Sequence, residues 1–148
     1  TISSKNYHNN MSFNSFRTAI STKLGTITEL AFVDDKHHTD ITGYPAATFE
    51  PVRLENEFYT SSDNKRLYQF TILVHQEMDT IGRDEAIRIL DATVDAIKSA
   101  FDTDYTLGGV VDYMDPITVD FGEYEEGNAS VKVAIIRVAG TAEEQVTV

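Results

Sequence analysis

Two hydrophobic periods occur in succession in the stretch NKRLYQFTILVHQEMDTIGRDEAIRILDATVDAIKSAF, residues 64–101. In its first part alternate residues are apolar, as in a strand that buries one face: Tyr68, Phe70, Ile72 and Val74. In its second part apolar residues recur every three or four positions, which is typical of a helix with one buried face: Ile87, Leu90, Val94, Ile97 and Phe101. A strand and a helix that each have one apolar face can bury each other. The stretch therefore predicts a strand and a helix packed on a common core.

The segments before this stretch predict another helix and a hairpin. From Ser12 to about Leu30 the apolar residues again follow helical spacing, and Ser12 is a suitable N-cap. Pro45 and Pro51 bracket a short strand at 46–50, and 56–59 continues extended. The polar turn TSSDN at 60–64 then leads into the long strand, so the region predicts a hairpin.

The segments after the stretch predict two or three further strands. Apolar residues alternate around 117–121, and the run SVKVAIIRVA at 130–139 is apolar on both faces. One face carries Val131, Val133 and Ile135, and the other carries Ala134, Ile136 and Val138. A strand that is apolar on both faces is usually central in a sheet or is covered on its second face by another subunit.

The order of these elements predicts an α+β fold. We expect a mostly antiparallel sheet of four to five strands, with two helices packed on one face. The 148 residues suit a single domain spanning 1–148. Residues 1–11 and 141–148 are polar, and we expect both ends to be flexible.

The composition excludes several classes of function. The chain has 24 acidic and 12 basic residues, a formal net charge of −12, which disfavours tight binding to nucleic acid or anionic lipid. It has no cysteine, so disulfides and thiolate metal sites are excluded. No apolar run approaches the ~18 residues of a membrane-spanning helix.

The sequence shows no catalytic motif. A loop at 34–44 contains the one cluster of metal-ligand residue types: Asp34, Asp35, His37, His38 and Asp40. The side chains of adjacent histidines on a loop diverge, and metal sites usually require an ordered surrounding shell. We therefore expect a solvated loop, no metal site and no cofactor. His75, on the polar face of the long strand, has no evident nucleophile beside it.

Four segments resemble the tail-terminator (tail-completion) proteins of long-tailed bacteriophages and of phage-like gene transfer agents. They are GYPAATFEP at 43–51, RLYQFTILV at 66–74, EAIRILD at 85–91 and TLGG at 106–109. The order of elements from about Phe13 to Ala139 carries the resemblance. It implies a structural virion protein without catalytic residues. Such a protein forms a ring, typically a hexamer, at the head-proximal end of the tail tube, stops tube polymerisation and docks to the head connector.

The resemblance also implies partners and a location. The expected partners are further copies of the chain, the major tail tube protein and the head–tail connector protein; no membrane is expected, and DNA passes through without specific binding. The expected location is the virion neck, after a soluble stage in the host cytoplasm. The apolar strand and nearby loops supply the candidate interface residues: Tyr44, Arg53, Asp63, Lys65, Val131, Val133 and Ile135.

Two alternatives remain open at this point. The chain could be another neck or tail component, such as a head-closure or tube-like protein. It could instead be a small enzyme or ligand-binding module with an unrecognised pocket. Mass in solution discriminates between a ring subunit and a stand-alone module.

Overall fold

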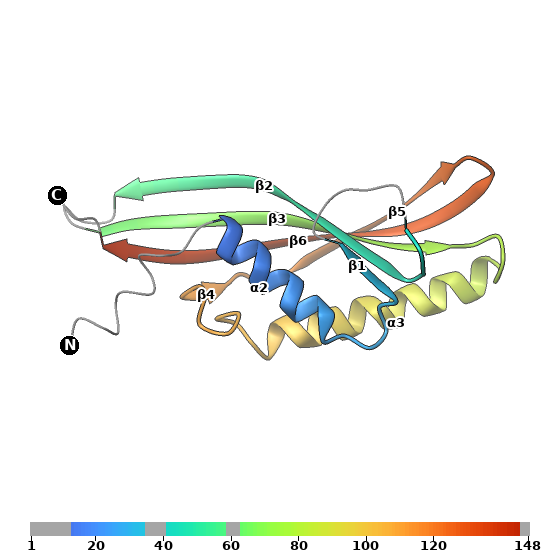
Figure 1. Cartoon of the computed structure of the whole chain (residues 1–148), viewed down its shortest axis with the longest axis horizontal. Helices are drawn as coiled ribbons and strands as arrows, with labels where there is room; N and C mark the ends of the chain where they lie inside the picture. Colours follow the sequence, from blue (N-terminus) through green and yellow to red (C-terminus); the bar gives the residue numbers. More distant parts are fainter. Residues whose placement is uncertain (1–12, 35–40, 59–62, 146–148) are drawn as a thin grey trace.

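The computed structural model describes residues 13–34, 41–58 and 63–145 as two helices and one six-stranded sheet (Figure 1). The helices are α2, Phe13–Gly25, and α3, Arg83–Asp102. The strands are β1, Phe32–Asp34; β2, Ala46–Phe58; β3, Asp63–Glu77; β4, Tyr113–Met114; β5, Thr118–Glu126; and β6, Ala129–Gln145. The predicted α+β class is confirmed.

The sheet is mixed, because one of its strand pairs is parallel. Its strand order is β1-β2-β3-β6-β4, and β5 also pairs with β6. The three-residue strand β1 runs parallel to β2, whereas the other pairs are antiparallel. Six strands therefore replace the expected four to five. β1 and β4 were missed because strands of three and two residues carry too little periodicity to detect.

The core lies between the helices and one face of the sheet. The alternating β3 residues Tyr68, Phe70, Ile72 and Val74 are all at most 1% exposed. Phe16 of α2 packs against two of them, with ring centroids 5.9 Å from Tyr68 and 5.3 Å from Phe70. Leu90, Ile97 and Phe101 of α3 belong to the same buried cluster. Both helices lie on the same side of the sheet in Figure 1.

The first helix is shorter than the sequence predicts. It ends at Gly25 instead of near Leu30. Beyond Gly25 the backbone forms tight turns, in which Thr26 N–H donates to the Lys23 carbonyl and Ile27 N–H to the Leu24 carbonyl. Glycine is a poor helix former, which explains the early end. Ser12, the expected N-cap, lies outside the described residues.

The C-terminal segment is more ordered than the sequence predicts. The expected flexible end at 141–148 is wrong up to Gln145, because residues 141–145 of β6 pair with residues 63–67 of β3. Ala142 is fully buried there. The polar sequence of 141–145 gives no sign of a strand. These residues pair because β3 extends far enough to lie beside them. Residues 1–12 and 146–148 lie outside the described part of the chain.

The expected short strand at 46–50 is the start of a longer one. β2 is continuous for 13 residues, with a register shift between Pro51 and Arg53. A β-bulge of this kind accommodates proline, which lacks the N–H that a regular ladder uses. Pro51 pairs with Phe70, Val52 has no partner in the register, and pairing resumes at Arg53, so the strand continues past the proline.

Candidate functional site

The candidate interface residues lie at two ends of the sheet. Tyr44 lies two residues before β2, near Glu77 and Glu126, and Val131 pairs with Glu77 in the same region. At the other end Arg53 pairs with Gln69, and Lys65 pairs with Glu57. Asp63 begins β3 there and pairs with Gln145. The two groups lie at different positions along the length of β2 and β3, so the seven residues do not form one continuous site.

β6 is central in the sheet and has no free edge along its apolar run. Residues 129–137 of β6 pair with β5 on one side, and 131–145 pair with β3 on the other. Val131 is 1% exposed and Val133 is 8% exposed, while Ile135 is half-buried. Of the three predicted contact residues on this strand, Ile135 presents the most surface to a neighbour.

A buried polar cluster lies on the sheet face opposite the helices. His75 is 3% exposed, and its Nε2 lies 3.1 Å from the Thr48 hydroxyl. Its Nδ1 lies 2.8 Å from the Tyr124 hydroxyl, whose ring packs edge-on against the imidazole. In a neutral imidazole one nitrogen donates a hydrogen bond and the other accepts one, so one hydroxyl accepts a hydrogen bond from the ring and the other donates one to it.

His75 lies on the strand face that the sequence predicts to be polar, but it is buried there. The hydroxyls come from β2 and β5, strands that are distant from β3 in sequence, so local periodicity could not show the burial. Both ring nitrogens are engaged inside the fold. His75 therefore links β3 to β2 and β5 through hydrogen bonds. Because it is buried and both nitrogens are hydrogen-bonded, it is poorly placed to act as a general base on a ligand.

Tyr124 should make the fold sensitive to high pH. Burial, with the nearby Tyr44 and Glu126, raises the pKa of Tyr124 from 10.0 to about 12. A pKa that is higher in the folded state gives stabilisation that is complete below pH 10 and lost as the pH rises through about 12. We expect the urea midpoint to fall from about pH 8 to about pH 11, and to fall less in Tyr124→Phe.

The control is Tyr105→Phe, since Tyr105 is 63% exposed. It should keep the pH dependence of the parent protein. The same fall in Tyr124→Phe as in the parent would show that the raised pKa of the half-buried Tyr124 does not cause the loss of stability.

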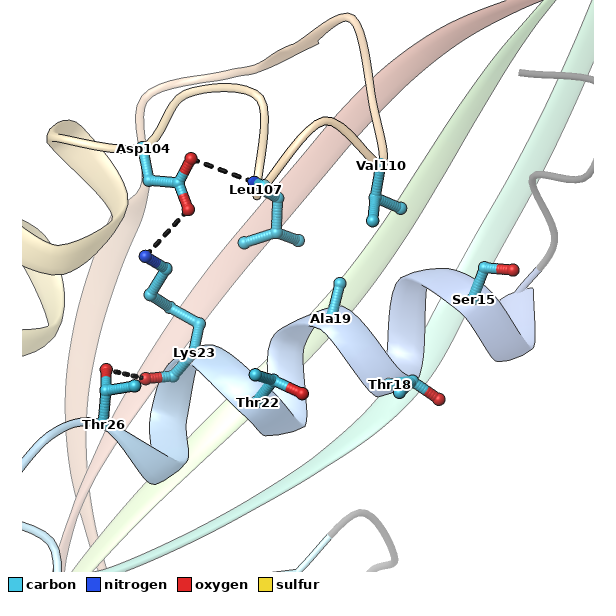
Figure 2. Close-up of a pocket in the computed structure, with 10 residues that line it drawn as sticks. Ser15, Thr18, Ala19, Thr22, Lys23, Thr26, Asp104, Leu107 and Val110 are labelled. Carbon is cyan, nitrogen blue, oxygen red and sulfur yellow. Dashed lines mark hydrogen bonds and ion pairs between the residues drawn. The ribbon is translucent and has the colours of Figure 1, made fainter. Parts of the chain in front are cut away.

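A surface groove of about 350 Å³ lies between α2 and the loop that follows α3 (Figure 2). Its lining combines hydroxyl-bearing, apolar and charged residues: Ser15, Thr18, Ala19, Thr22, Lys23, Thr26, Asp104, Leu107, Gly108 and Val110. At one end Lys23 Nζ lies 2.8 Å from the Asp104 carboxylate, which also accepts the Gly108 N–H at 3.0 Å. These bonds, the one from Lys23 first, hold the pKa of Asp104 below its ordinary value.

The loop beside the groove has an unusual backbone. Leu107, Gly108 and Gly109 have φ values of 51°, 71° and 89°, a left-handed run that favours glycine. This path turns Leu107 inward, where it is 3% exposed. The TLGG sequence predicts a tight connector but gives no sign of the groove, because α2 supplies its other wall.

Neither feature assembles recognisable catalytic chemistry. The residues lining the groove include no histidine, and its lysine and carboxylate neutralise each other. Within residues 13–34, 41–58 and 63–145, no three His, Cys, Asp or Glu side chains gather as a metal site would require. Asp34 belongs to β1, whereas Asp35, His37, His38 and Asp40 lie outside the described residues.

Comparison with known proteins finds no matching family model and no matching curated protein. In the described part of the chain, neither helix combines the length and apolar character needed to cross a membrane.

Proposed function

We propose that this chain is a structural subunit of a phage tail, a tail terminator that forms a ring at the head-proximal end of the tube. The resemblance of segments 43–51, 66–74, 85–91 and 106–109 to tail-terminator proteins motivates the proposal. The ring, a hexamer in this proposal, stops tube polymerisation and offers the head connector a docking surface. The net charge of −12 suits a channel that DNA crosses without adhering.

The observation that best supports assembly is the sheet face opposite the helices, here called the open face. The open face carries the exposed Arg137 among half-buried residues of β3 and β6: Leu67, Gln69, Thr71, Leu73, Ile135 and Ala139. Both described helices pack on the other side of the sheet. Leucine and isoleucine side chains on this face keep partial contact with solvent. A neighbouring subunit that covers them would lower the free energy of the assembly.

Deletion of the gene in the parent phage tests the function. We expect head–tail joining to fail and tails to have irregular or excessive length in electron micrographs. Tails of normal length that lack heads would indicate a head-closure protein instead. Normal virions would refute a role in the neck.

Complementation with point variants tests the open face. We expect Thr71→Lys to fold but to restore few infectious particles, because a lysine would place charge and bulk in the subunit contact. Ser99→Lys is the matched control, since Ser99 is exposed on α3. Light scattering over a concentration series should show that the parent assembles and Thr71→Lys does not. Equal complementation by both variants would exclude the open face as the ring contact.

A further inference from the structure

The two long strands at the borders of the sheet differ in how they resist further pairing. β2 meets β1 only at Ala46–Thr48, so its outer edge beyond Thr48 has no strand beside it among the described residues. Pro51 and the register shift next to it interrupt this edge. Proline and bulges are standard protection against strand addition, so the β2 edge is a poor acceptor.

β5 lacks this protection. Its nine residues pair with β6 in unbroken register from Thr118↔Arg137 to Glu126↔Ala129, and its sequence TVDFGEYEE contains no proline. In the described part of the chain, no strand lies on its outer side. The outward-pointing N–H and C=O groups of β5 therefore form a regular, exposed template for one more strand.

The side chains of β5 indicate the chemistry of a partner. All four charged residues are acidic: Asp120, Glu123, Glu125 and Glu126. Arg137 neutralises Asp120, and Arg83 and Lys132 neutralise Glu123. Among the described residues, Glu125 and Glu126 have no cationic partner, and they point to opposite faces of the sheet because they are adjacent. Phe121 is 52% exposed on the same strand.

We propose that the outer edge of β5 binds an extended, basic segment of another protein, which adds to the sheet as a further strand. Backbone hydrogen bonds to β5 supply the attachment. The selectivity comes from side chains of the partner: lysine or arginine opposite Glu125 and Glu126, and an apolar residue beside Phe121. The β5 edge is separate from the open face, so this binding does not depend on the proposed ring.

A second copy of the chain is a poorer occupant of this edge. Each copy carries a net charge of −12, and two β5 edges would oppose acidic side chains. Like charges directly across a strand pair are destabilising. The edge of β2 is interrupted by Pro51 and its bulge. A basic segment of a different protein avoids both obstacles.

The test uses the full chain and a blocked synthetic peptide of about nine residues, with lysines at both ends, valine at the centre and threonine elsewhere. Calorimetric titration should show binding, and amide exchange should slow in Thr118–Glu126. Reversing both free charges, Glu125→Lys with Glu126→Lys, should weaken binding about tenfold. Asp91→Lys with Asp95→Lys on exposed positions of α3 is the matched control and should change affinity less than about twofold.

Two N-methylated peptides separate strand addition from general charge attraction. Methyl groups on one set of alternate amides should abolish binding, while the other set leaves it within about twofold, because only alternate amides face β5. Equal binding of both would overturn the proposal, as would equal binding of a peptide with glutamate in place of lysine. No binding at millimolar peptide would also overturn it. The mass of the protein in solution without peptide is a further readout. If this mass shows a dimer in the parent but not in the double charge reversal, the edge binds a second copy, and the proposal of a different protein partner is refuted.

Discussion

Replacing Phe70 with alanine is expected to lower the free energy of unfolding by about 3–5 kcal/mol. Phe70 is 1% exposed, and its ring centroid lies 5.3 Å from that of Phe16 and 6.1 Å from that of Phe49. The Arg17 guanidinium carbon also lies 5.7 Å from the ring centre. Alanine removes the ring that joins α2, β2 and β3. The rings of Phe16 and Phe49 pack against Phe70 from α2 and β2, so they have little freedom to collapse into the space.

Urea unfolding monitored by circular dichroism measures this loss. Thr71→Ala is the control, since Thr71 is the next residue of β3 but lies half-buried on the open face. It should cost about 0.5 kcal/mol or less. Ile97→Ala, which empties the α3 side of the same core, should cost about 2–5 kcal/mol. Equal midpoints for Phe70→Ala and Thr71→Ala would mean that the two faces of β3 are wrongly assigned.

The long elements could be predicted because each carries its own repeat. The alternation Tyr68, Phe70, Ile72 and Val74 gives the buried face of β3, and the spacing from Leu90 to Phe101 gives that of α3. These patterns depend on local geometry alone. The same holds for β6, whose two apolar faces identify a strand that is central in the sheet.

The remaining features depend on contacts between distant segments. His75 is buried because Thr48 and Tyr124 supply hydroxyls to its ring, and the three residues are far apart in the sequence. The groove similarly needs α2 on one side and the 104–110 loop on the other. Polar residues 141–145 form a strand because β3 is long enough to pair with them. None of these outcomes is encoded in the periodicity of a single segment.

Replacing Gly140 with valine is expected to destabilise the fold by about 3 kcal/mol, near the upper end of the usual cost of overpacking. Gly140 is buried in β6, where it pairs with Tyr68 of β3 and with Met114 of β4. A Cβ atom at this position would lie 2.9 Å from Met114 Sδ, 2.9 Å from Phe16 Cε1 and 3.0 Å from Val111 Cγ1. Valine favours strands, so its intrinsic preference would stabilise β6, and any loss must come from the crowding.

Gly122→Val is the matched control, because Gly122 also lies in a strand but a Cβ there would meet only Val133 Cγ1, at an ordinary 3.6 Å. Its effect should be within about 0.5 kcal/mol. Combining Gly140→Val with Met114→Ala should recover part of the loss, since alanine removes the sulfur that the new side chain meets. The double-mutant cycle should therefore give a coupling free energy of about 1 kcal/mol in the direction of rescue. Additive losses would show that the contact with Met114 is not what requires glycine at this position.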